Sequence, residues 1–225
     1  MQIIKSTAAA LILACASVSA FASLTNPEVG KEYVVLAQPQ QTDSVGKIEV
    51  TEFFFYSCPH CNVLDPLITE WVKKQGAAIS FKRVPIAFDK STEPLQRLFY
   101  TLEIMGKLED LHSKIFRAIH TERVFMRTDQ DMVNFVVKNG VDQLKYLEIS
   151  KSFGVESKMA RAKALAASYK IEFVPQVFVD GHYMTAPSQL QQAIPRTSEL
   201  EGARNMLPVL DALVLKAQKE HGFKK

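Results

Sequence analysis

Two cysteines separated by two residues are the side chains of this chain best suited to chemistry. Cys58 and Cys61 flank Pro59 and His60, and Ser57 separates them from the run 48–56, which is rich in beta-forming residues. That run predicts a buried strand that turns at once into a helix, with Cys58 in the first turn and Pro59 where a missing N–H costs nothing. The free N–H groups and the helix dipole favour an anionic sulfur. We therefore expect a lowered pKa for Cys58 and a thiolate near neutral pH.

A stabilised thiolate has a redox consequence, because it favours the dithiol over the disulfide, and such a disulfide is readily given up to other thiols. The alternative chemistry for the pair is metal binding. A tetrahedral zinc site needs four ligands, and the only other cysteine is Cys15, near the N-terminus. His112 and His120 are further candidates, but their positions in a helical pattern favour surface locations. We expect neither a bound metal nor a cofactor.

The N-terminal residues 1–22 have the features of a secretory signal. Lys5 is their only charge, an apolar stretch follows at 8–16, and Ala20-Phe21-Ala22 matches a small-x-small cleavage pattern. We predict cleavage after Ala22, so that the dithiol works in an oxidising compartment. The alternative is a lipoprotein acylated at Cys15, although Leu13 fits that motif poorly.

Length and charge narrow the class of protein further. The 225 residues carry a formal net charge of +3, which gives no indication of nucleic-acid binding. A chain of this length can build one elaborated domain or two small ones around a sizeable core. A disulfide between Cys58 and Cys61 closes almost no loop, so its value is not structural.

Alternating and helical patterns predict strands at both ends of the chain and helices between them. Beta-forming residues predict strands near 30–36, at 48–56 and 79–85, and at 173–179 with a return strand after the Asp180-Gly181 turn signal. Helical spacing predicts a helix after Cys58 that contains Pro66, and a final helix at about 206–219 behind a Ser198/Glu201 capping pair. Five helices are predicted between the strands, beginning near residues 91, 108, 128, 142 and 156.

This order of elements, with Cys-x-x-Cys at a strand-to-helix junction, resembles the thioredoxin fold. The run Phe53–Cys61, the helical block and Val174-Pro175 narrow the likeness, and the chain resembles the DsbA family of periplasmic thiol oxidases. The resemblance implies an α/β protein with a thioredoxin-like domain at 23–90 and 171–225. Residues 91–170 would form the inserted helical domain.

The resemblance also implies roles for individual residues. Cys58 is the exposed sulfur that a substrate thiolate attacks, and Cys61 is its more buried partner. Pro59 and His60 tune the Cys58 thiolate, since His60 can donate a hydrogen bond or a charge to it. Val174-Pro175 matches the family's cis-proline loop, in which the Val174 backbone pairs with an extended substrate.

Glu52 presents a separate problem, because an unpaired carboxylate in an apolar strand is costly. Lys82, on the neighbouring predicted strand, is the expected partner. The resemblance places this pair beneath Cys61, where it tunes or relays protons. The alternative is that Glu52 reaches the surface.

The resulting hypothesis is a monomeric periplasmic oxidase that donates its Cys58–Cys61 disulfide to unfolded or partly folded exported proteins with free cysteines. A quinone-linked membrane partner of the DsbB type would reoxidise it. A reductase or isomerase of the same fold is an alternative, although residues 23–47 are too few for the dimerisation domain of an isomerase. From another class, a non-catalytic metal-binding or chaperone protein is the remaining alternative.

Overall fold

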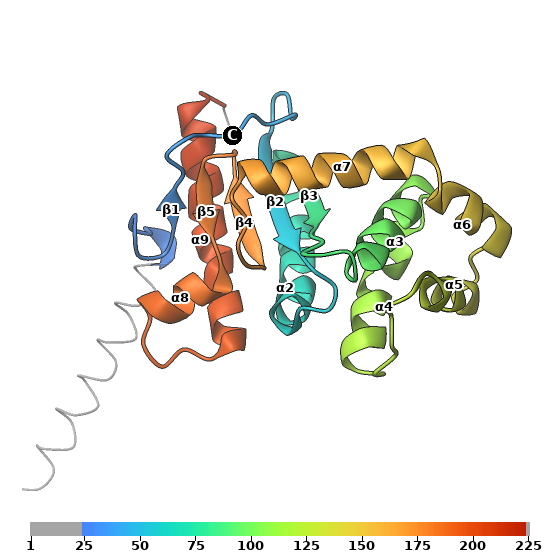
Figure 1. Cartoon of the computed structure of the whole chain (residues 1–225). Coiled ribbons are helices and arrows are strands. Elements are labelled where there is room, and N and C mark those ends of the chain that lie inside the picture. The colour runs from blue at the N-terminus through green and yellow to red at the C-terminus, as the bar shows by residue number, and fades with distance from the viewer. Residues whose placement is uncertain (1–23, 224–225) are drawn as a thin grey trace, which may run out of the picture. The chain divides into compact units, whose positions relative to one another are not determined.

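The computed structural model describes residues 24–223 (Figure 1), so the predicted signal segment and Cys15 lie outside the described residues. The strands are β1 (Val34–Val35), β2 (Ile48–Phe54), β3 (Ile79–Pro85), β4 (Gln176–Val179) and β5 (Tyr183–Thr185). The helices are α2 (Pro59–Gln75), α3 (Glu93–Ile104), α4 (Leu108–His120), α5 (Asp129–Lys138), α6 (Gln143–Ser150), α7 (Phe153–Ser168), α8 (Pro187–Ala193) and α9 (Glu199–Glu220), with a 3₁₀ turn at Gly76–Ala78. None of the described helices combines the length and the apolar character needed to cross a membrane.

The strands form a sheet in the order β1-β5-β4-β2-β3. All seven residues of β2 are buried, as expected for a strand covered on both faces. By contacts, the described chain divides into two compact units, one of residues 24–50, 75–80 and 177–223 and the other of Thr51–Lys74 and Phe81–Gln176. The sheet and the helical segment confirm an α/β protein with a thioredoxin-like fold and inserted helices.

In the first unit, β5 pairs antiparallel with both β1 and β4. The hairpin predicted between β4 and β5 is confirmed, since Asp180 and Gly181 both adopt the positive φ angles, 57° and 60°, that this tight turn needs. The sequence placed the start of the first hairpin strand at Phe173, whereas β4 begins at Gln176. Pro175 has no N–H to contribute to a ladder, which explains the later start.

Two helices complete the first unit, and α9 runs beside β5 (Figure 1). The Ser198/Glu201 capping box is confirmed, and α9 begins directly after it and continues through Pro208. Its predicted start near residue 206 was therefore too late. The short helix α8 was not predicted; it packs against α9 at Gly202.

The second unit holds the Cys-x-x-Cys segment and the helices of the insertion. Helix α2 continues through Pro66. The five predicted helices correspond to α3–α7, and the capping box formed by Thr128 and Asp131 at the start of α5 is confirmed. These helices span residues 93–168, and the domain boundaries at 91 and 170 stay a prediction.

Candidate active site

The two cysteines lie at the junction between β2 and α2. Cys58 precedes the first residue of α2, Pro59. Its N–H donates to the Phe55 carbonyl at 3.0 Å, and its own carbonyl accepts from Asn62 N–H at 3.1 Å, so backbone hydrogen bonds hold the turn on both sides. Cys61, one helical turn further on, is fully buried, whereas Cys58 is half-buried. The pair therefore presents one accessible sulfur and one protected sulfur.

The thiols of Cys58 and Cys61 differ in acidity because their hydrogen bonds and their burial differ. The largest influence on the pKa of Cys58 is a hydrogen bond from the Cys61 thiol, which lowers it. Partial burial acts in the opposite direction, but the backbone N–H groups of Cys61 and His60 and the charge of His60 lower the pKa further, to about 6. Burial raises the pKa of Cys61, and the neighbouring Cys58 sulfur raises it further. The lowered pKa predicted for Cys58 is thus found, and at neutral pH its sulfur is the anionic one.

The Val174-Pro175 segment lies at the same site. Its peptide bond is cis, as the family resemblance implied. The Val174 carbonyl lies 3.5 Å from Cys58 Sγ and accepts a hydrogen bond from it when the thiol is protonated. Backbone polar groups of Val174 are thus placed beside the reactive sulfur.

Glu52 is buried in β2, but the partner expected for it was wrong. Its carboxylate accepts a hydrogen bond from Arg83 Nε at 3.1 Å, and the pair is buried. Lys82 is half-buried and adjoins Arg83 in β3, so strand alternation directs its side chain to the opposite face. Burial is the largest influence on Glu52 and raises its pKa to about 7, against the charge of Arg83. The charge of Glu52, after burial and the Cys58 sulfur, also raises the pKa of Cys61.

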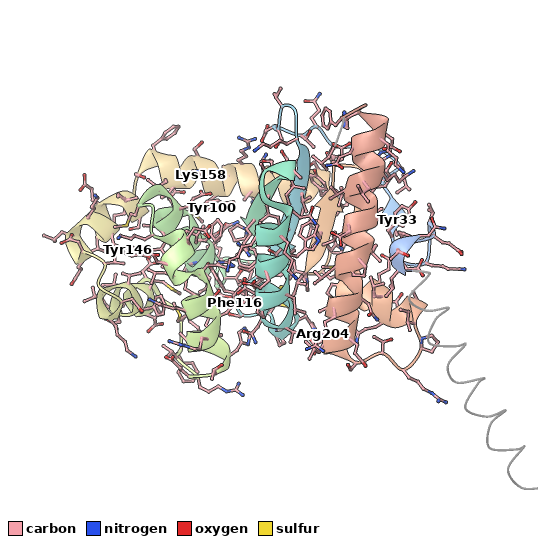
Figure 2. The ribbon with its side chains drawn as sticks, turned by 180° about the vertical axis from the view of Figure 1, so that it is seen from behind. Tyr33, Tyr100, Phe116, Tyr146, Lys158 and Arg204 are labelled. Atoms are coloured by element: carbon pink, nitrogen blue, oxygen red, sulfur yellow. The ribbon has the colours of Figure 1, made fainter. Side chains whose placement is uncertain are left out.

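Two histidines of α4 contact the strand-to-helix turn, contrary to the surface positions expected for them. His112 is buried, and its Nδ1 lies 2.7 Å from the Tyr56 hydroxyl. His120 Nε2 donates to the Tyr56 carbonyl at 2.8 Å. Phe116, labelled in Figure 2, lies between them on the same helical stripe and packs against the Tyr56 ring. The i, i+4, i+8 spacing with Phe116 is the signal in the sequence that could have indicated a buried face.

Asp65 of α2 connects this histidine to the Glu52 pair. One carboxylate oxygen lies 3.1 Å from His112 Nε2 and 3.5 Å from Arg83 Nη2. Sequence reasoning did not single out Asp65 or Arg83. Among residues 24–223, no group of three or more His, Cys, Asp and Glu side chains is arranged to hold a metal ion.

A nucleophilic sulfur at a helix start, backed by a protected sulfur that can displace it, exchanges disulfides with other thiols. This chemistry on this fold defines a thiol-disulfide oxidoreductase of the thioredoxin class. Comparisons with known proteins agree with that class. The sequence profile described as DSBA-like thioredoxin domain matches residues 49–195.

Relatives extend the likeness to almost the whole chain. Thiol:disulfide interchange protein DsbA of Bordetella parapertussis is 37% identical over 218 residues, which are 96% of this chain and 100% of that protein. DsbA of Burkholderia cepacia is 39% identical over 209 residues, 92% of this chain and 94% of its own. The crystal structure of Pseudomonas aeruginosa DsbA is 34% identical with a TM-score of 0.78, and the match covers 88% of this chain and 97% of that one. The chain belongs to the DsbA family.

Proposed function

We propose that this oxidoreductase works as an oxidase in the periplasm, where it transfers its Cys58–Cys61 disulfide to newly exported proteins. The observation that carries the proposal is the contrast between the two sulfurs, with the pKa of Cys58 lowered to about 6 and that of buried Cys61 raised. A stabilised Cys58 thiolate favours the dithiol state, so the disulfide state is a good oxidant.

The reaction begins when a substrate thiolate attacks Cys58 Sγ. The substrate–Cys58 bond forms, the Cys58–Cys61 bond breaks, and Cys61 leaves with the electron pair. Because Cys61 is buried, its sulfur needs a proton, and the Glu52 carboxyl, with a pKa of about 7, is a suitable donor. This assigns Glu52 and its partner Arg83, rather than Lys82, to tuning the buried sulfur.

A second substrate thiolate then attacks the substrate sulfur of the mixed disulfide. The substrate gains its own disulfide, and Cys58 leaves as a thiolate, which its low pKa makes easy. The net result is a two-electron reduction of this protein and oxidation of a substrate cysteine pair. Pro59 and His60 contribute to the stability of the leaving Cys58 anion.

Substrate binding involves the Val174-Pro175 segment. The Val174 carbonyl lies beside Cys58 Sγ, where an extended substrate chain can pair with it as a short added strand. This binding mode recognises the substrate backbone rather than its side chains, so it suits many different unfolded or partly folded substrate proteins.

The catalytic cycle needs a reoxidant, and we assign this role to a membrane quinone reductase of the DsbB type. The protein works as a monomer without a bound cofactor. It reaches the periplasm through the N-terminal signal, cleaved after Ala22.

Stoichiometric oxidation of a two-cysteine peptide by the oxidised protein tests the proposal. We expect rapid peptide oxidation by the unmodified protein and its loss in Cys58→Ser. Cys61→Ala is prepared with Cys58 in a mixed disulfide with glutathione. A one-cysteine peptide should displace the glutathione and remain trapped on Cys58 as a mixed disulfide. A protein that reduces insulin but does not oxidise the peptide would be a reductase or isomerase. Stoichiometric metal with no thiol exchange would indicate a non-catalytic protein.

A further inference from the structure

One guanidinium group in the second unit faces two buried carboxylates. Arg83 Nε lies 3.1 Å from Glu52 Oε2, and Arg83 Nη2 lies 3.5 Å from Asp65 Oδ1. All three side chains are largely buried. A single positive charge cannot balance two anions at this depth, so one of the two carboxyls is the better site for a proton.

The two carboxyls have unequal support. Ser113 Oγ donates to Asp65 Oδ2 at 3.0 Å, and His112 Nε2 lies 3.1 Å from Asp65 Oδ1. Glu52, by contrast, accepts its side-chain hydrogen bond from Arg83 alone among the described residues. Because hydrogen bonds to an anion favour the anion, Asp65 is the carboxyl better held in its charged form.

The protonation state of His112 follows from its surroundings. Burial is the largest influence and lowers its pKa, so the ring is neutral near pH 7. Burial also raises the pKa of Tyr56, so the Tyr56 hydroxyl keeps its hydrogen and donates it to His112 Nδ1 at 2.7 Å. The remaining ring hydrogen therefore sits on Nε2, the atom that lies 3.1 Å from Asp65 Oδ1.

We propose that His112 is a positioning residue of the redox site: by holding Asp65 as the anionic partner of Arg83, it leaves Glu52 as the carboxyl that carries the exchangeable proton near Cys61. The inference rests on the proposed function only for what that proton does. The choice between the two carboxyls depends on the contacts of Arg83, Asp65 and His112 themselves.

Two further titratable groups, Glu109 and Cys61, interact with members of the cluster. Glu109 on α4 contributes a negative charge that favours protons on its neighbours, His112 and Tyr56 included. Cys61 on α2 is the titratable neighbour of Glu52. Neither of them distinguishes Asp65 from Glu52, whereas Ser113 and Thr69 donate hydrogen bonds to Asp65 and His112 Nε2 lies 3.1 Å from its Oδ1.

The test is a ¹³C NMR titration of the Glu52 and Asp65 carboxyl carbons in the reduced full chain. In His112→Leu, which keeps an apolar side chain among the surrounding aromatic rings, we expect the apparent pKa of Asp65 to rise. We expect the apparent pKa of Glu52 to fall by about 1 unit, because once Asp65 is protonated the charge of Arg83 stabilises the Glu52 carboxylate alone. Ser113→Ala removes an exposed side chain and should cause a smaller shift in the same directions.

His120→Leu is the matched control, since it lies on the same helix and contacts Tyr56 rather than Asp65. Its titration should equal that of the unmodified protein. Unchanged Glu52 and Asp65 titrations in folded His112→Leu would overturn the inference. If His112→Leu does not fold, the absence of any shift in Ser113→Ala overturns it. Failure of the unmodified protein to oxidise the two-cysteine peptide would instead count against the proposed function and leave this inference standing.

Discussion

At the scale of single residues, the site depends on two sulfurs one helical turn apart in different surroundings. Cys58 is half-buried and accepts hydrogen bonds, whereas Cys61 is enclosed. The lowered pKa of Cys58 stabilises the reduced protein at pH 7 by about 1 kcal/mol, after allowance for solvent screening of a partly exposed group. That is equivalent to about 20 mV in reduction potential, so helix and hydrogen bonds contribute a measurable share of the oxidising power.

The first prediction concerns this hydrogen bond. In the reduced protein, Cys58 should titrate near pH 6, measured as thiolate absorbance against pH. In Cys61→Ala the largest stabilising contact is lost, so the midpoint should rise by about 1 unit or more. The titration step should vanish in Cys58→Ser. A midpoint in Cys61→Ala equal to that of the unmodified protein would show that Cys61 does not stabilise the thiolate.

The second prediction concerns Glu52. Its pKa is about 7 in the folded protein against 4.5 as a free side chain. A carboxyl with a raised folded pKa stabilises the fold fully below pH 4.5, and this contribution is lost as the pH rises through 7. The free energy of unfolding of Glu52→Gln, relative to the unmodified protein, should therefore improve by about 3 kcal/mol between pH 4.5 and pH 8.

Urea denaturation at the two pH values measures that difference. Asp65→Asn is the informative comparison. Burial would raise the pKa of Asp65, but His112, Arg83 and Ser113 together lower it, so its contribution is present at high pH and lost on acidification. The relative stability of Asp65→Asn should change with pH in the opposite direction, and a change of the same sign in both variants would contradict these assignments.

At the scale of elements, local patterns predicted most helices and strands but not which residues meet. The Cys58 turn, the Asp180-Gly181 hairpin and the capping boxes are encoded within a few neighbouring residues. The partner of Glu52 is not. Lys82 and Arg83 are two neighbouring basic residues of β3, so the sequence pattern could not show which of them lies on the same sheet face as Glu52.

The cluster of Asp65, Arg83 and His112 was missed for the same reason. Its members come from α2, β3 and α4, and only tertiary packing brings them together. Helix α8 was missed because its seven residues are too few for a helical period to stand out.

The third prediction concerns the packing of α8 against α9. A Cβ at Gly202 would lie 2.8 Å from the Pro187 carbonyl oxygen and 2.7 Å from Gln191 Cγ. Alanine gains about 1 kcal/mol in helix propensity over glycine, but displacing a backbone carbonyl costs about 1–3 kcal/mol. Gly202→Ala should therefore lower the free energy of unfolding.

Gly154→Ala is the matched control, because a Cβ there meets Ile104 Cδ1 at an ordinary 3.4 Å in helix α7. This variant should gain stability by up to about 1 kcal/mol. The free energies of unfolding of both variants, measured by chemical denaturation, separate the packing cost at Gly202 from the gain in helix propensity. Equal stabilisation in the two would mean that α8 moves away without cost.

At the scale of the whole molecule, the evidence joins a redox pair, a thioredoxin-like fold with inserted helices, and membership of the DsbA family. The family match covers residues 49–195, which include Cys58, Cys61, Val174 and Pro175. The Cys58–Val174 contact brings together residues on either side of the inserted helices. The reactive sulfur and the Val174 backbone that we propose as the substrate-binding segment are therefore brought together by the fold rather than by one local motif.

The central claim is that the disulfide form of this protein is a strong oxidant. Equilibration with mixtures of reduced and oxidised glutathione measures it directly, because the fraction of Cys58–Cys61 dithiol gives the reduction potential. We expect a potential more oxidising than about −200 mV, since a stabilised Cys58 thiolate favours the reduced protein. A potential near the value of about −270 mV typical of thioredoxin would contradict the claim and indicate a reductase.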